Sequence, residues 1–114
     1  MTVLGKPFTM RANQSLAINF SVPAKCSNVR VQGNFEVTGG KDLLVFLVDE
    51  DNLANFVNKQ AADVLYSSGP STQSTLDLRL PPDQKKYYVV FDSSLCRSTL
   101  TVNSSVKLVC DRLP

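Results

Sequence analysis

Histidine is absent from this sequence, which removes Ser-His and Cys-His nucleophile pairs and the usual general base near neutral pH. The five glycines form no Gly-x-Gly-x-x-Gly or Gly-Lys-Ser/Thr pattern, so we expect no phosphate-binding loop. No apolar run approaches the ~20 residues that a membrane helix needs, and the amino terminus lacks the pattern of a signal peptide. We therefore predict a protein that is not an enzyme and does not insert directly into a membrane.

Charge of either sign is sparse and dispersed. Twelve basic and ten acidic side chains give a net charge of +2 over 114 residues, which does not indicate nucleic acid as a partner. With 43% apolar residues, the chain has the composition of one folded domain, residues 1–114, with a core of its own. The compartment stays open: exported or extracellular if the chain is an excised domain, and otherwise cytoplasmic.

The strongest structural signal is the run of six apolar residues at 43–48. Side chains of a strand alternate between two faces, so such a run predicts a central strand that is covered on both sides. The spacing of Leu53, Phe56 and Val57 after it predicts a short helix over 51–59, capped by Asp49 or Asp51.

Alternating apolar residues predict further strands on both sides of this centre. This alternation covers residues 16–22, 29–37, 76–80 and 100–110. Residues 64–66 form another short strand, and residues 87–91 form a second, nearly continuous run of β-prone residues that should lie beside the first run. Residues 1–12 form an edge strand or a flexible arm. Gly33 falls on an apolar face, which indicates a bulge or a close backbone approach. We predict an all-β fold: a two-sheet antiparallel β-sandwich, jelly-roll or GOLD-like, of about 7–8 strands with one short helix after the central strand.

Three cysteines cannot all pair within one chain. Either all three are thiols, or two of them form a disulfide. If residues 99–110 form one extended strand, Cys96 and Cys110 lie ~45 Å apart and cannot bond. Since first and last strands of a sandwich often pair antiparallel, the predicted disulfide joins Cys26 to Cys96.

The densest acidic cluster follows the central strand and comprises Asp49, Glu50 and Asp51. Carboxylates in a loop suit calcium, although the EF-hand pattern fails here because Ala54 occupies the glycine position. The alternative is a helix cap with acids favoured by the helix dipole. We expect no cofactor, with calcium as the alternative.

Bases and aromatics adjoin at Lys85, Lys86 and Tyr87, a pattern that could hold a ring by stacking. Strand alternation opposes this role, because one residue of the Tyr87–Tyr88 pair must face the core. We retain Tyr87, Lys85 and Lys86 as candidate binding residues, and edge solubility as the alternative for the lysines.

The segments Phe35–Asp42 and Tyr88–Asp92 resemble the GOLD (Golgi dynamics) domain, a small β-sandwich found in secretory-cargo receptors and lipid-transfer proteins. In that family Gly-Gly with a following Asp precedes a core strand, as Gly39, Gly40 and Asp42 do here. The segment Leu80–Pro82 with the tyrosines after it is similar to bacterial pre-peptidase C-terminal sandwiches. Val90 and Ser93 depart from the cargo-receptor pattern. The resemblance implies a sandwich with a binding role.

These observations lead to three hypotheses. The first is a non-catalytic β-sandwich that binds a protein or glycan in an exported or envelope-associated system, as a monomer or weak dimer. The second is a calcium-binding accessory sandwich. The third is a carboxylate-based hydrolase, which requires two acids facing each other in a cleft.

Overall fold

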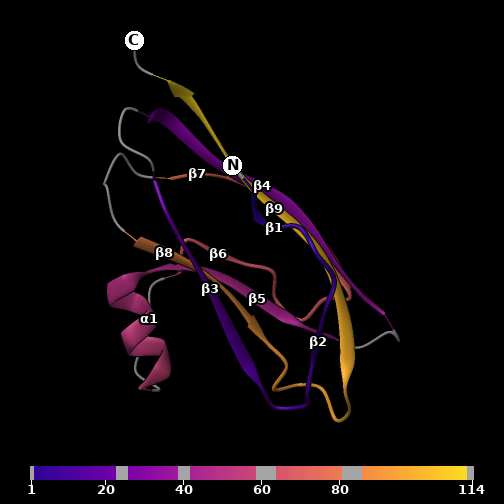
Figure 1. Ribbon diagram of the computed structural model, residues 1–114. Coiled ribbons are helices and arrows are strands. Elements are labelled where there is room, and N and C mark those ends of the chain that lie inside the picture. Colours follow the sequence, from indigo (N-terminus) through magenta and orange to yellow (C-terminus); the bar gives the residue numbers. More distant parts are fainter. Residues whose placement is uncertain (1, 23–25, 39–41, 59–63, 81–85, 113–114) are drawn as a thin grey trace.

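The computed structural model describes residues 2–22, 26–38, 42–58, 64–80 and 86–112. In this part of the chain two antiparallel sheets pack face to face with one short helix beside them (Figure 1), which confirms the predicted β-sandwich. The elements are β1 (Thr2–Leu4), β2 (Phe8–Met10), β3 (Ser15–Ser21), β4 (Cys26–Thr38), β5 (Leu44–Asp49), α1 (Glu50–Val57), β6 (Tyr66–Ser67), β7 (Gln73–Arg79), β8 (Lys86–Asp92) and β9 (Leu100–Arg112).

The five-stranded sheet has the order β1-β9-β4-β7, and β2 also pairs with β9. The four-stranded sheet has the order β3-β8-β5-β6. Strands β4 and β9 are thirteen residues each and pair from Cys26 opposite Arg112 to Thr38 opposite Thr101. The amino-terminal segment forms edge strands β1 and β2 on β9, as the edge-strand interpretation of residues 1–12 predicts.

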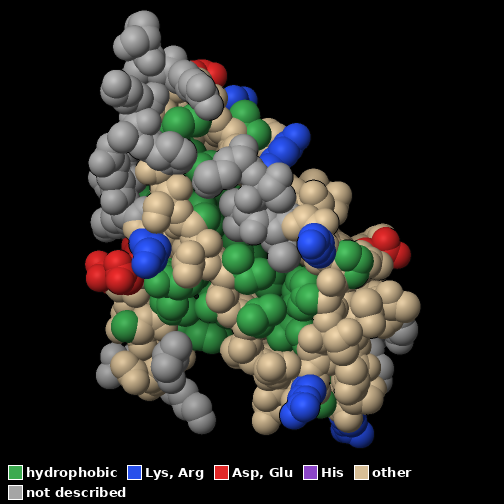
Figure 2. Space-filling model, in the orientation of Figure 1, with side chains coloured by type: hydrophobic (Ala, Val, Ile, Leu, Met, Phe, Trp, Pro, Cys, Tyr) green, Lys and Arg blue, Asp and Glu red, His purple; other side chains and the backbone are tan. Residues whose placement is uncertain are grey.

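The core lies between the sheets and consists of the inward side chains of both. Val31, Leu47, Phe91 and Val102 are completely buried there. Figure 2 shows apolar side chains gathered in the middle of one face of the molecule, while the Lys and Arg side chains in view are scattered. Among the described residues, no helix is long and apolar enough to cross a membrane.

The predicted central strand is β5, preceded by Leu43, and it is an inner strand of its sheet. It lies beside β8, the second run of β-prone residues, with Phe46 opposite Val90. The prediction that both faces are covered holds only in part. Leu43, Val45 and Leu47 are buried in the core; on the other face Val48 is completely buried, whereas Leu44 and Phe46 are half-buried.

Helix α1 covers part of that other face. Asp49 is its N-cap: the Asp49 side chain accepts hydrogen bonds from the backbone N–H of Asn52 at 2.8 Å and from Asn52 Nδ2 at 3.0 Å. The rings of Phe46 and Phe56 lie 5.6 Å apart, so the helix packs on β5 through an aromatic contact. We call the outer surface of the four-stranded sheet the roofed face.

Gly33 shows the close backbone approach that its position in the sequence indicates. A methyl group added there would overlap the backbone oxygen of Ser105 and come within 2.8 Å of Val106 Cα. Ser104, the polar residue that interrupts the apolar face of β9, is buried and donates a hydrogen bond to the backbone oxygen of Asn34 at 2.9 Å. Both residues therefore allow β4 and β9 to lie close together.

Candidate functional site

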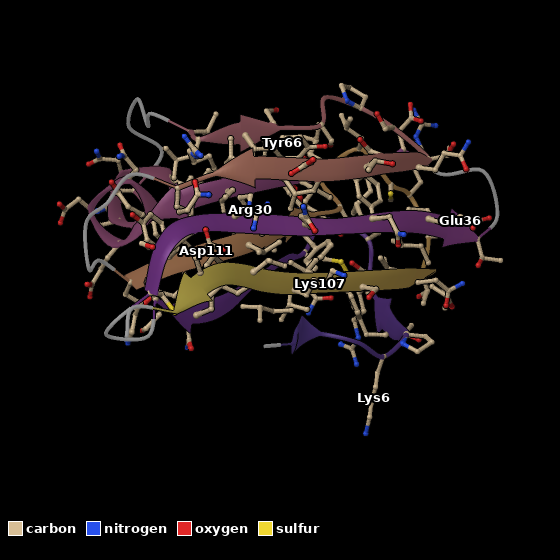
Figure 3. All side chains as sticks on the ribbon, turned by 90° about the horizontal axis from the view of Figure 1, so that it is seen from above. Lys6, Arg30, Glu36, Tyr66, Lys107 and Asp111 are labelled. Carbon is tan, nitrogen blue, oxygen red and sulfur yellow. A yellow bond between two sulfur atoms is a disulfide. The ribbon has the colours of Figure 1, made fainter. Side chains whose placement is uncertain are left out.

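The outer surface of the five-stranded sheet carries mostly polar side chains, and we call it the open face; Figure 3 looks onto its strands. Alternation places every second side chain of β4, β7 and β9 on this surface. Strand register then sets these side chains in rows across the sheet: Asn34 lies opposite Thr75 on one side and Ser105 on the other, and Glu36 lies opposite Gln73 and Asn103. All six side chains are solvent-exposed.

Two shallow hollows adjoin on this face, and Asn34 and Glu36 line both of them. The larger, about 510 Å³, is completed by residues of β7, among them Gln73 and Thr75. The smaller, about 220 Å³, is completed by Pro7 and residues of β9 that include Asn103. Amide, hydroxyl and carboxylate groups therefore converge on two neighbouring depressions. Between them, these groups can both donate hydrogen bonds to a polar ligand and accept hydrogen bonds from it.

The other end of the open face carries a charged cluster. Arg30 and Arg79 stand directly opposite each other on β4 and β7, an arrangement that is unfavourable for two like charges. The polar side chain of Asn28 lies close to these charges. Asn28 has a positive φ of 55° and belongs to an irregular part of β4. Asn28 accepts a hydrogen bond from Arg79 and donates one to Asp111 at 3.2 Å. An Arg30 guanidinium nitrogen lies 3.9 Å from an Asp111 carboxylate oxygen, and Figure 3 shows the two side chains side by side.

Acid catalysis by a carboxylate pair does not fit the hollows. The acids that this face carries nearest to them are Glu36 and Asp77, and Asp77 lies opposite Gln32, four residues along β4 from Glu36. Glu36 is the one acid among the described residues that line these two hollows. A glycoside hydrolase needs two carboxyl groups roughly 5–9.5 Å apart, with the substrate between them. The two described hollows therefore lack the pair of facing acids that the hydrolase hypothesis requires.

The predicted stacking site is wrong for Tyr87. Its side chain is 1% exposed and its ring stacks on that of Phe20, with the ring centres 5.8 Å apart, so no ligand can reach it. Alternation decides which of the two adjacent tyrosines enters the core, and the structure assigns that place to Tyr87, leaving Tyr88 half-buried on the roofed face. Lys86 is exposed, and Lys85 lies outside the described residues.

The predicted disulfide is also wrong in one partner. Cys26 pairs with Cys110, with the two Cα atoms 5.5 Å apart, a separation that a disulfide can span. The error lay in assuming that the last strand begins beside the first cysteine. Because β4 and β9 run antiparallel over their full length, the start of β4 meets the end of β9. Cys96 is buried at the edge of the core, and its thiol donates to the backbone oxygen of Asp42 at 3.1 Å.

The acidic cluster is divided between two environments. Asp49 holds the N-terminus of α1, while Glu50 and Asp51 occupy its first turn and are exposed. This arrangement matches the helix-cap alternative. Within the described residues no group of three or more Cys, Asp or Glu side chains is placed to hold a metal ion. The calcium hypothesis stays a prediction.

No family model matches this chain, and no curated protein matches it in sequence. Its fold is similar to that of PliG from Aeromonas hydrophila, a periplasmic inhibitor of g-type lysozyme: the TM-score is 0.55 at 10% identity, over 91% of this chain and 83% of PliG. Xylanase 10C of Cellvibrio japonicus, in complex with xylopentaose, aligns with 90% of this chain and 22% of its own chain at 14% identity, with a TM-score of 0.49. The likeness to PliG supports the sandwich fold.

The sequence shows that most of the residues lining the hollows are polar, but it does not show that they lie together. Asn34, Glu36, Gln73 and Asn103 are all polar residues at the outward positions of alternating strands. Alternation predicts only that each of them faces solvent. Their convergence depends on which strands are neighbours and in what register, and no local pattern carries that information.

Proposed function

We propose that this protein is a non-catalytic binding module that recognises a protein partner through the open face. The observation that carries the proposal is the pair of adjoining hollows that share Asn34 and Glu36. A flat surface with depressions rich in amides and hydroxyls suits the hydrogen-bonding groups of a protein surface, where interfaces carry about one hydrogen bond per 100–200 Å².

A protein is a better partner for this face than a glycan. None of the residues that line the described hollows is an exposed aromatic, since Phe35 is 5% exposed and belongs to the core. Aromatic rings supply the large apolar contact on which a sugar ring can lie. A glycan would have to be held by hydrogen bonds alone, in competition with water.

The disulfide between Cys26 and Cys110 supports a proposal about the compartment. Disulfides persist in secreted and periplasmic proteins and are rare in the cytosol. We infer that the protein acts in an oxidising compartment. PliG, which shares the fold, is periplasmic and inhibits a lysozyme, so lysozymes are the first partner class to test.

The test measures binding of the oxidised protein to g-type and other lysozymes, with soluble chito- and xylo-oligosaccharides as the glycan arm. Glu36→Lys, alone and with Asn34→Ala, is compared with Glu50→Lys, the same change at an exposed glutamate on α1. We expect lysozyme binding to weaken about tenfold or more for the open-face variants and to stay unchanged for Glu50→Lys. An equal loss of lysozyme binding in Glu36→Lys and in Glu50→Lys would show that the partner binds elsewhere. Unimpaired binding by the double variant Glu36→Lys with Asn34→Ala would show the same.

Two further outcomes of the same panel bear on the proposal itself, and the first of them overturns it. If the oligosaccharides bind and no lysozyme does, the module recognises glycans. If neither class binds, affinity capture from an extract of the source periplasm or secretome, with the double variant as control, decides between a different protein partner and none. Specific capture abolished in the double variant supports the open face, and identical capture by both proteins contradicts it.

A further inference from the structure

Strand β7 is the edge strand of the five-stranded sheet at the end away from β1 and β2, and its backbone hydrogen-bonding groups alternate in direction. Leu80 donates its N–H to the backbone oxygen of Val29, and Thr72 accepts from the N–H of Val37, so even-numbered residues of this strand face β4. In an antiparallel strand the residues between them face the other way. The N–H and C=O groups of Gln73, Thr75, Asp77 and Arg79 therefore point away from β4, along the edge of the sheet.

The side chains at this edge carry one negative and one positive charge. Asp77 and Arg79 both project onto the open face and are exposed. On the inner face, Leu76 and Leu80 are 5% and 4% exposed, whereas Leu78 between them is only partly buried. An additional strand beside β7 would satisfy the outward backbone groups and cover Leu78.

We propose that the occupant of this edge is β7 of a second copy of the chain, paired antiparallel about a two-fold axis at Leu78. The residues whose backbone N–H and C=O groups point to the edge are odd-numbered, and these groups must pair with each other across the two-fold axis. Each allowed register therefore sets odd-numbered residues of one copy opposite odd-numbered residues of the other. With Asp77 opposite itself or Arg79 opposite itself, like charges meet. In the register centred on Leu78, Asp77 of each copy stands opposite Arg79 of the other, and both charges find the opposite sign.

The surroundings of Arg79 favour this register further. Arg79 already stands opposite Arg30 across β4, where Asp111 is the carboxylate within ion-pair distance of Arg30. Asp77 of the second copy would bring a further negative charge to this pair of guanidinium groups. Arg79 retains donors for it, because a guanidinium has five N–H groups and the contact with Asn28 uses part of this set. The two open faces would then join into one continuous sheet surface.

The test is a charge-swap series measured by analytical ultracentrifugation of the oxidised protein, at concentrations up to about 1 mM because a short edge gives a weak dimer. We expect the wild type to dimerise at low salt and to dissociate toward about 1 M salt, where ion pairs are screened. Asp77→Arg should abolish the dimer, Arg79→Asp should abolish it, and combining the two should restore it, since the pairs re-form with their signs exchanged. Lys107→Glu, an exposed reversal on β9 away from this edge, should leave the dimer intact.

A cysteine placed on the axis checks the register independently. Leu78→Cys sits opposite its own copy in a pair without backbone hydrogen bonds, where side chains approach most closely, so mild oxidation should cross-link it. Leu76→Cys, two residues off the axis, should cross-link much less, and circular dichroism shows whether each variant is folded.

A monomeric wild type at the highest concentration, or a double charge-swap variant that stays monomeric although folded, overturns the proposal. Asn19→Arg changes β3, an edge strand of the other sheet. If this variant loses the dimer and Asp77→Arg keeps it, the interface lies at the β3 edge and the proposal is wrong. Binding of the partner by the monomeric Asp77→Arg variant is measured alongside, because the proposed function does not depend on dimerisation.

Discussion

The two outer faces of this sandwich differ although both come from alternating strands. The roofed face presents Leu44, Phe46 and Tyr88, each half-buried, and α1 packs on it through Phe56. The open face presents amides, hydroxyls and charges, and no described helix covers it. Apolar outward residues thus accompany a cover made by the chain itself, whereas polar outward residues leave a surface available to another molecule. This difference directs the search for function to β4, β7 and β9.

The largest expected loss of stability comes from breaking the disulfide that joins β4 to β9 at one end of the open face. Reduction, or Cys26→Ser with Cys110→Ser, should lower the free energy of unfolding by about 4 kcal/mol, because the cysteines are 84 residues apart and the unfolded chain gains entropy when released. Denaturant unfolding with and without reductant measures the loss. Cys96→Ala should keep the sensitivity to reductant; if that variant abolishes it, Cys96 and not Cys110 is the partner of Cys26.

The next effect concerns the contact between the two long strands under the open face. Gly33→Ala should destabilise the protein by about 3 kcal/mol, because the added methyl group overlaps the backbone of β9 at Ser105 and Val106. Gly69→Ala is the control: it has open space but a φ of +63°, so it should cost only about 1 kcal/mol. Thermal unfolding of both variants decides, and equal costs would mean that the strands can separate at Gly33.

A direct comparison of the two faces uses one truncation on each. Phe56→Ala should cost about 2 kcal/mol, since it removes a half-buried ring that contacts Phe46. Asn34→Ala should change stability by less than about 0.5 kcal/mol, because its side chain is exposed. Urea unfolding measures both. Similar losses for the two variants would show that the open face contributes to folding as much as the roofed face does.

A smaller effect than those at the disulfide, Gly33 and Phe56 is expected at the start of the helix that covers the roofed face. Asp49→Ala should cost about 1 kcal/mol through loss of the N-cap. If capping is the whole role of Asp49, the melting midpoint of the wild type is the same with calcium as with a chelator. An ion that binds only the folded state raises the midpoint, so a rise with calcium that disappears in the Asp49→Ala variant would favour the calcium hypothesis.

Local patterns in the sequence were sufficient to predict most of the strands, the helix and the sandwich. Alternation located β3, β4, β7 and β9, and the change to helical spacing after Val48 located α1 to within two residues at each end. Gly33 signalled a close contact, which the structure places at β9. These features depend on neighbouring residues, so the chain itself carries the information.

Features that depend on which strands are neighbours could not be predicted. The partner of Cys26 depends on the pairing of β4 with β9, and the choice of Tyr87 over Tyr88 for the core depends on the face that β8 turns inward. The hollows around Asn34 require three strands in register. The resemblance to GOLD and pre-peptidase sandwiches stays a prediction, since the features that carry it describe how a sandwich is built.

The pairing of β4 with β9 also sets the order of events when the protein is made. The sheet that carries the open face cannot close until β9 has left the ribosome, because the three strands that pair with β9, namely β1, β2 and β4, all precede it in the chain. Contacts between residues so distant in sequence form slowly. On our proposal that the protein acts in an oxidising compartment, this delay would keep the chain unfolded enough to pass through a membrane before the disulfide forms.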